Sequence, residues 1–353
     1  MQRPIWHSTI VLLGLLALPQ AMPAQETMVL RPARVFDGSQ MHDGWYVVVT
    51  GDRIAQAGPA TSIGTPPGAA IIDLAGLTLL PGLIEGHSHL LLHPYNETPW
   101  TNQVLNESLG QRIARGVVHA RNTLLAGVTT ERDLGTEGAG YGDVGLKEAI
   151  ELGVIPGPRL IVTTKAIVAT GSYNPKGAPE LRLPKGAEVA DGHDELIRVT
   201  RDQIGRGADW VKIYADYRWG PNGTNQPSFT EAELSLVVEA AESSGRRVAA
   251  HANSAEAIKR AVRAGVKTIE HGDEADHEAL ELMASHGVGL CPTLAASDAV
   301  LQYGGWRKGI DPEPERIRPR AGTDSTQETG IPDGARPERG PVLRWRRGRL
   351  PAR

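Results

Sequence analysis

The amino-acid sequence predicts an α/β protein: a (β/α)8 TIM-type barrel, incomplete because strand 8 is missing or replaced, preceded by a small N-terminal β domain. Two observations support this fold class. Residues 25–80 contain short alternating segments separated by turns such as Asp37-Gly38, which is typical of a small β domain. In residues 81–316, short apolar segments alternate with amphipathic stretches, which indicates parallel strands joined by helices.

Each element is predicted from its local pattern. Apolar residues at helical spacing predict helices at residues 106–125, 254–264 and 274–286, and Thr230 with Glu233 forms a capping box that opens a helix ending before Gly245. The β domain is expected to have strands at 29–35, 45–49, 53–57, 70–74 and 77–80, and the barrel at 79–84, 128–131, 160–166, 209–214, 247–252, 266–270 and 288–294.

The N-terminal segment has the pattern of a secretory signal. Arg3 precedes the apolar run 9–18, and small residues follow at Ala21 and Ala24. We therefore expect a signal peptide at residues 1–24 and a periplasmic or secreted mature protein. The apolar run is shorter than the roughly 20 residues that a membrane span needs, so no span is expected after cleavage.

Composition excludes further classes of function. The formal net charge is only −4, and no long run of one sign occurs, so a nucleic-acid partner is not expected. Cys291 is the only cysteine, so an internal disulfide is excluded and burial of the core must stabilise the fold. The oligomeric state does not follow from the sequence.

A His-x-His motif ends the first predicted barrel strand. His87 and His89 follow an apolar segment, and residues i and i+2 of a strand project to the same side. Two imidazoles placed in this way can bind one divalent cation. The position matters because barrel active sites lie at the carboxyl ends of the strands.

Three later strands carry similar side chains. Lys212 lies inside the apolar segment Val211-Lys212-Ile213, and His251 and His271 each follow an apolar strand. A buried lysine is unfavourable if it is charged and unpaired, and reaction with CO2 would convert it into a carbamate anion able to bridge two metal ions. The remaining histidines of the predicted domains, His93 among them, are expected to be structural.

These motifs resemble those of the amidohydrolase superfamily, in the branch of imidazolonepropionase-like proteins and Xaa-Pro dipeptidases. The resemblance covers roughly residues 28–316, and Glu85 stands where the superfamily more often has aspartate. The strings that carry it are LLPGLIEGHSHL, GADWVKIYAD, RVAAHANS and TIEHGDEAD.

The resemblance implies a metal-activated water that hydrolyses a carbon–nitrogen bond of a small amide or a dipeptide, cyclic amides included. It implies two divalent ions, with zinc expected. His87 and His89 would bind one ion, His251 and His271 the other, and carboxylated Lys212 would bridge them. Arg132 and Asp133 are candidates for support of the site, and Tyr214, Tyr217 and Arg218 for substrate contact.

The family also uses an aspartate at the end of strand eight as the proton acceptor, and this chain offers only Asp324 there. The residues before it, 316–321, do not form an apolar strand, so Asp324 is expected to imitate the motif by chance. Residues 317–353 are rich in Arg, Pro and Gly and have no amphipathic repeat.

A shift of reading frame is one explanation of this tail. Degenerate codons for residues 327–353, read one base later, permit a helix, a turn and an apolar strand that ends in Gly-Asp-Val-Gly. Three alternatives therefore stand: a hydrolase impaired by the altered tail, an inactive metal-binding remnant, and an intact enzyme that uses Asp324. The exact substrate and the metal do not follow from the sequence.

Overall fold

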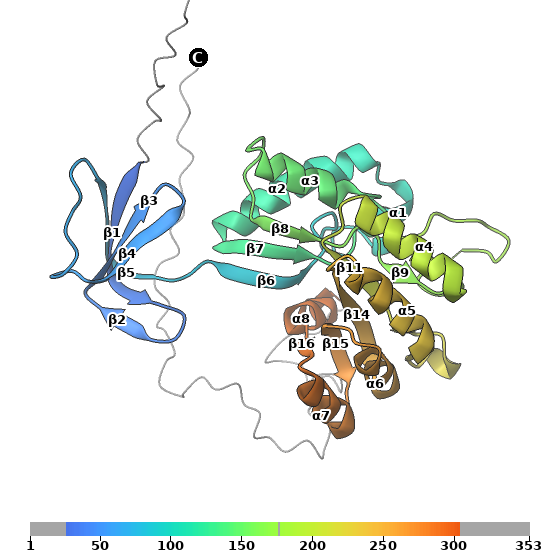
Figure 1. Cartoon of the computed structure of the whole chain (residues 1–353). Coiled ribbons are helices and arrows are strands. Elements are labelled where there is room, and N and C mark those ends of the chain that lie inside the picture. The colour runs from blue at the N-terminus through green and yellow to red at the C-terminus, as the bar shows by residue number, and fades with distance from the viewer. Residues whose placement is uncertain (1–25, 176, 304–353) are drawn as a thin grey trace, which may run out of the picture. The chain divides into compact units, whose positions relative to one another are not determined.

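The computed structural model describes residues 26–175 and 177–303 (Figure 1). The predicted signal peptide at 1–24, the tail at 317–353 and Asp324 lie outside the described residues. The chain divides into two compact units after Gly82, close to the predicted boundary at residue 80. Among the described helices, none combines the length and the apolar composition that crossing a membrane requires.

The first unit contains a five-stranded sheet, in which β2, β1, β3 and β4 are antiparallel neighbours and β5 pairs parallel with β1. The separate strands predicted at 70–74 and 77–80 form one strand, because Gly76 takes a φ of +79° and pairing with β1 continues after a register shift. The strands are β1 Thr27–Phe36, β2 Met41–Asp43, β3 Trp45–Thr50, β4 Arg53–Pro59 and β5 Ala70–Leu79.

The second unit is an α/β fold of the TIM-barrel type. Its parallel strands form two sheets, β6-β7-β8 and β10-β9-β11-β14-β15-β16, and a short antiparallel pair, β12-β13, follows β11. The strands are β6 Leu83–Ser88, β7 Val128–Asp133, β8 Arg159–Val162, β9 Ile167–Val168, β10 Glu188–Val189, β11 Trp210–Tyr214, β12 Asp216–Tyr217, β13 Gln226–Pro227, β14 Arg247–Ser254, β15 Thr268–Glu274 and β16 Gly289–Cys291.

Helices connect these strands and lie outside them (Figure 1). The capping box predicted at Thr230 and Glu233 is confirmed, and Ser254, where the predicted helix at 254–264 begins, is the N-cap of the next helix. The helices are α1 Trp100–Asn106, α2 Leu109–Leu125, α3 Gly142–Glu151, α4 Gly192–Gly205, η1 Pro221–Gly223 (a 3-10 turn), α5 Glu231–Glu242, α6 Ala255–Arg263, α7 His277–His286 and α8 Leu294–Tyr303.

The predicted barrel strands have other bounds in the structure, and three of them illustrate the difference. The strand predicted at 79–84 begins only at Leu83. The strand predicted at 160–166 ends at Val162, because Thr164 takes a φ of +61°, and pairing resumes in β9. The strand predicted at 288–294 ends at Cys291, because Pro292 has no N–H to donate and the next residue has a positive φ.

Alternation along β11 separates the core from the barrel interior. Val211 and Ile213 are fully buried in the large apolar cluster that includes Leu234 of α5 and Ile258 of α6. Because successive side chains of a strand point to opposite faces, Lys212 is directed away from these helices and into the barrel. The apolar core therefore fixes the position of the one basic residue in β11.

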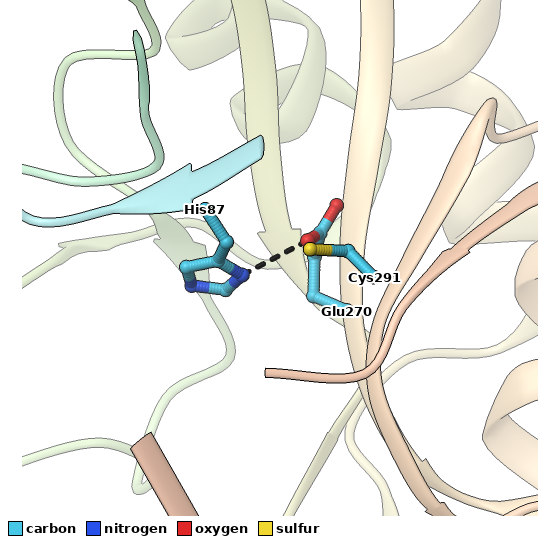
Figure 2. Close-up of side chains that lie close together, drawn as sticks. All are labelled: His87, Glu270 and Cys291. Atoms are coloured by element: carbon cyan, nitrogen blue, oxygen red, sulfur yellow. Dashed lines mark hydrogen bonds and ion pairs between the residues drawn. The ribbon is translucent and has the colours of Figure 1, made fainter. Parts of the chain in front are cut away.

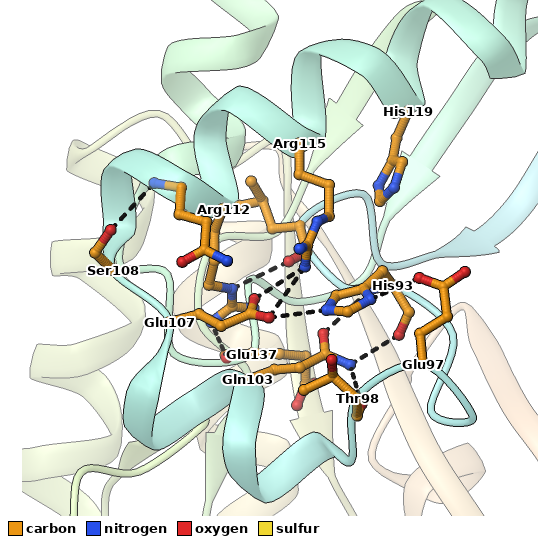
Figure 3. A network of polar contacts seen from close by, with 12 residues as sticks. His93, Glu97, Thr98, Gln103, Glu107, Ser108, Arg112, Arg115, His119 and Glu137 are labelled. Atoms are coloured by element: carbon orange, nitrogen blue, oxygen red, sulfur yellow. Dashed lines mark hydrogen bonds and ion pairs between the residues drawn. The ribbon is translucent and has the colours of Figure 1, made fainter.

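A polar network around His93 holds the segment between β6 and α2 (Figure 3). The ring nitrogens of His93 lie 3.0 Å from a carboxylate oxygen of Glu97 and 2.9 Å from one of Glu107. Glu107 also accepts from the Arg115 guanidinium. Gln103 donates to the His93 carbonyl, and its own side-chain oxygen accepts the His93 N–H.

Candidate metal centre

The structure brings the four predicted histidines together inside the barrel. The ring centroids of His87 and His89 lie 5.3 Å apart, those of His87 and His271 5.0 Å, and those of His251 and His271 4.6 Å. These residues come from β6, the turn after it, β14 and β15. The strand register explains part of this convergence. His251 of β14 pairs with Glu270 of β15, and Glu270 directly precedes His271 in the sequence.

Lys212 lies in the same interior with its side chain fully buried. Its Nζ has no hydrogen-bond partner among the described residues and lies 5.4 Å from the centroid of the Tyr214 ring. Burial lowers the pKa of this amine to about 8, although the negative charge of Glu270 opposes the shift. The amine is therefore unusually easy to deprotonate for a lysine.

Three of the imidazoles are neutral at pH 7. Burial, reinforced by the positive charge of Lys212, lowers the pKa of His271 to about 3. Burial also lowers the pKa of His87 and holds that of His251 well below its ordinary value. A neutral imidazole has a lone pair to offer, so these side chains have the protonation state that metal binding requires.

Hydrogen bonds decide which ring nitrogen is available. The Nδ1 atoms of His87, His89 and His271 lie 2.9, 2.9 and 2.7 Å from oxygens of Glu270, Gly135 and Thr293. In each ring this bond leaves Nε2 to act as a ligand.

His251 has the opposite arrangement. Its Nε2 lies 3.1 Å from the Asn253 amide and 3.5 Å from Asp216, while its buried Nδ1 has no partner among the described residues. The neutral rings, the partnerless His251 Nδ1 and the partnerless Lys212 amine together fit a metal centre.

Backbone strain at His271 turns two successive side chains into the site. His271 has a φ of +73°, an uncommon conformation for a residue other than glycine. In a regular strand Glu270 and His271 would point to opposite faces. Here Glu270 bonds to His87 while the His271 ring also lies beside His87. Sequence analysis missed Glu270, because in a regular strand its side chain would face away from that of His271.

Two further acidic residues hold the ends of the strands. Asp216, which sequence analysis missed, is fully buried and accepts from the backbone N–H groups of Asn253 and Ser254 at 2.8 and 2.6 Å. Asp133 accepts from the N–H groups of Leu90 and Gly135, and burial raises its pKa well above the ordinary value. The candidate Asp133 thus contacts the segment that follows His89.

Figure 2 shows His87, Glu270 and Cys291 side by side. One possible ligand atom from each residue lies within 4.8 Å of the others, and among the described residues this is a group that could hold a metal ion. Burial raises the pKa of the Cys291 thiol, and Glu270 adds to the effect, so the thiol form is favoured. Arg132, also a predicted candidate, donates to Glu270 at 2.9 Å.

Comparison with known proteins gives the class that the fold and the site define. Residues 78–303 match the model of the amidohydrolase family, and the chain belongs to this family. The family is generally metal-dependent, which agrees with neutral imidazoles gathered at the ends of parallel strands.

Particular relatives cover most of the described residues. The ochratoxinase of Aspergillus niger is 32% identical over 253 residues, which make up 64% of this chain and 50% of that protein. A solved Xaa-Pro dipeptidase with bound methionine is 30% identical with a TM-score of 0.70, covering 83% of this chain and 72% of that chain. A putative prolidase from Bifidobacterium longum is 28% identical with a TM-score of 0.60, covering 77% of this chain and 62% of that chain. The chain spans about half the length of the curated ochratoxinase it matches.

Proposed function

We propose that this protein is a metal-dependent hydrolase of carbon–nitrogen bonds in small amides or dipeptides. The observation that carries the proposal is the convergence of four histidines and a buried lysine inside one barrel. Family membership supports the reaction class, and relatives named as an ochratoxinase and an Xaa-Pro dipeptidase support the substrate class.

In this proposal the five side chains hold two divalent ions, with zinc expected: His87, His89, Lys212, His251 and His271. When bound, the ions supply Lewis-acid polarisation of the scissile carbonyl and lower the pKa of a water. The protein's own contribution is the burial that keeps the imidazoles of His87, His251 and His271 neutral.

The surroundings of Lys212 support its carboxylation. With a pKa of about 8, roughly a tenth of the amine is neutral at pH 7. Neutral Nζ attacks the carbon of CO2, a nitrogen–carbon bond forms, and the nitrogen releases a proton, which leaves a carbamate anion. The fully buried, partnerless amine thereby becomes an anionic ligand, which supports the assignment.

A cavity of about 190 Å³ beside His271 supports a small substrate. Arg218 and Asp273 both line it, and the Arg218 guanidinium can pair with a substrate carboxylate. Val300 and Leu301 of α8 line it as well and suit an apolar side chain. An N-acyl amino acid or a dipeptide has both features, and its scissile bond would lie near His271.

A second candidate function is that of an inactive metal-binding remnant. It is favoured by the two separate sheets, because among the described residues β16 pairs only with β15 and β6 only with β7. We propose that the barrel is open between these strands and that hydrolysis is impaired, since the described residues include no aspartate at the end of an eighth strand. The exposure of Leu290 in β16, at 43%, supports an uncovered edge.

One experiment separates the two functions. The purified chain is stripped of metal, reloaded with zinc, and assayed for bound zinc and for hydrolysis of Xaa-Pro dipeptides and N-acyl amino acids by chromatography. A hydrolase binds zinc and releases amino acids, and His251→Ala lowers the bound zinc and abolishes the release. A remnant binds zinc without turnover. His277→Ala is the matched control, because this histidine is exposed and pairs with Glu281 on α7.

A further inference from the structure

Three side chains form a buried linkage that ends on His87. The Nδ1 of His87 lies 2.9 Å from one oxygen of Glu270, and the other oxygen accepts from Arg132 at 2.9 Å and from the Thr268 hydroxyl at 2.6 Å. The Glu270 side chain is fully buried and that of His87 is 5% exposed. Both oxygens of the Glu270 carboxylate therefore have defined hydrogen-bond partners.

Arg132 ties this carboxylate to both sheets. Its Nε donates to the Gly86 carbonyl in β6 at 2.7 Å, and its other nitrogens donate to Thr268 and Glu270 in β15. The guanidinium also lies 4.8 Å from the Trp210 ring centroid. Because β6 and β15 belong to different sheets, the linkage spans the barrel interior where no backbone ladder joins them.

We propose that Glu270, held by Arg132 and Thr268, is the positioning residue that fixes the tautomer and the orientation of the His87 ring. This inference rests on the proposed metal-binding function. Glu270 accepts the proton of Nδ1 and so directs the Nε2 lone pair into the site. Such an outer carboxylate commonly sets both the geometry and the basicity of a metal-binding imidazole.

A competing assignment makes Glu270 itself a metal ligand together with His87 Nδ1 and Cys291. The contacts favour positioning, because the Arg132 cation already occupies one oxygen of Glu270 and the His87 ring the other. A metal ion among the three side chains would have to displace the ring and compete with a guanidinium. The two assignments differ in what they require of Cys291.

The chain offers a close control for this linkage. The His93–Glu107–Arg115 trio repeats the same chemistry, with an imidazole 2.9 Å from a carboxylate that also accepts from an arginine. Glu107 is largely buried, with a side-chain exposure of 8%. His93 is not a predicted ligand, so a change there tests the loss of a buried imidazole–carboxylate pair without a change at the site.

The test substitutes Glu270→Gln and Glu107→Gln in the full chain. The amide at 270 can turn its NH2 group toward His87 Nδ1, which moves the ring proton to Nε2. Alternatively it turns the NH2 group toward Arg132, which places two hydrogen-bond donors against each other. Zinc affinity is measured by competition with a chromophoric chelator. The His87 tautomer is read in the metal-free protein from nitrogen chemical shifts.

We expect Glu270→Gln to weaken zinc binding by about 10- to 100-fold and to change the His87 tautomer, while Glu107→Gln leaves both unchanged. Cys291→Ser keeps the affinity of the unaltered chain. Wild-type affinity in Glu270→Gln overturns the inference, as does an equal loss in Cys291→Ser. If Glu270→Gln does not fold, Arg132→Lys serves as the test variant. Weakened zinc binding in it supports the inference, and unchanged zinc binding refutes it.

The outcome is separable from the proposed function. A chain that binds zinc and shows the expected tautomer but hydrolyses no amide overturns the hydrolase assignment and leaves the positioning role intact. Amide hydrolysis by the unaltered chain together with wild-type zinc affinity in Glu270→Gln supports the hydrolase assignment and overturns the positioning role.

Discussion

Replacement of Lys212 by methionine tests the physical state of the buried amine. Methionine has similar length and flexibility but no charge and no strong polar group. The amine has no hydrogen-bond partner among the described residues, so the substitution breaks no such bond there. We expect Lys212→Met to stabilise the metal-free protein and to impair zinc binding.

The magnitude follows from the pKa of Lys212, which burial lowers from 10.5 to about 8. That shift corresponds to roughly 3 kcal/mol of unfavourable free energy for the charged form in the folded state. Below pH 8 both the folded and the unfolded lysine are protonated, so the full penalty is present at pH 7. Between pH 8 and pH 10.5 the folded lysine loses its proton first, so wild-type stability rises and the advantage of methionine falls toward zero.

The assay is urea unfolding of both proteins at pH 7 and pH 10, in buffer free of metal and CO2. Lys267→Met serves as the control, since the Lys267 side chain is 45% exposed and its ammonium pairs with Glu242. That control should change stability by less than about 0.5 kcal/mol at either pH. A Lys212→Met protein less stable than wild type at pH 7 would refute the account of Lys212 as an unpaired buried amine.

Three further substitutions test how the site is supported, each by urea unfolding. Thr230→Ala removes the capping box of α5 and should lower stability by about 1 kcal/mol, whereas an unchanged midpoint would show that the cap contributes nothing. Asp216→Ala leaves two buried N–H groups without an acceptor and should lower stability by about 2–5 kcal/mol; a change below 1 kcal/mol would contradict their burial. Arg112→Met removes donors to the carbonyls of Leu91, Thr136 and Glu137, so a loss of about 3 kcal/mol is expected, and full stability would mean that other donors replace it.

Local patterns made part of this site predictable. His87 and His89 share a spacing that strand geometry converts into a common direction, and Lys212 stands out because alternation places it opposite the apolar core. Helix starts at Thr230 and Ser254 were predictable because capping depends on residues within one turn. These signals are contained in a few consecutive residues.

Other parts depend on tertiary contacts that no local pattern encodes. The bond from His87 to Glu270 joins residues 183 positions apart, and the direction of Glu270 depends on an irregular φ at His271. A strand template assigns successive residues to opposite faces and therefore excludes Glu270 from the site. The break between β8 and β9 was missed for the same reason, since Thr164 departs from strand geometry.

The separation of His87 and Glu270 along the chain also affects the order of events during synthesis. At roughly 5–20 residues per second, the 183 positions between them take on the order of ten to forty seconds to translate. During this interval the His87–His89 pair exists on the nascent chain without the carboxylate that orients one of its rings. If the proposed metal centre forms, an ion captured before β15 has been made would meet this unoriented pair and would be held less tightly than in the finished protein.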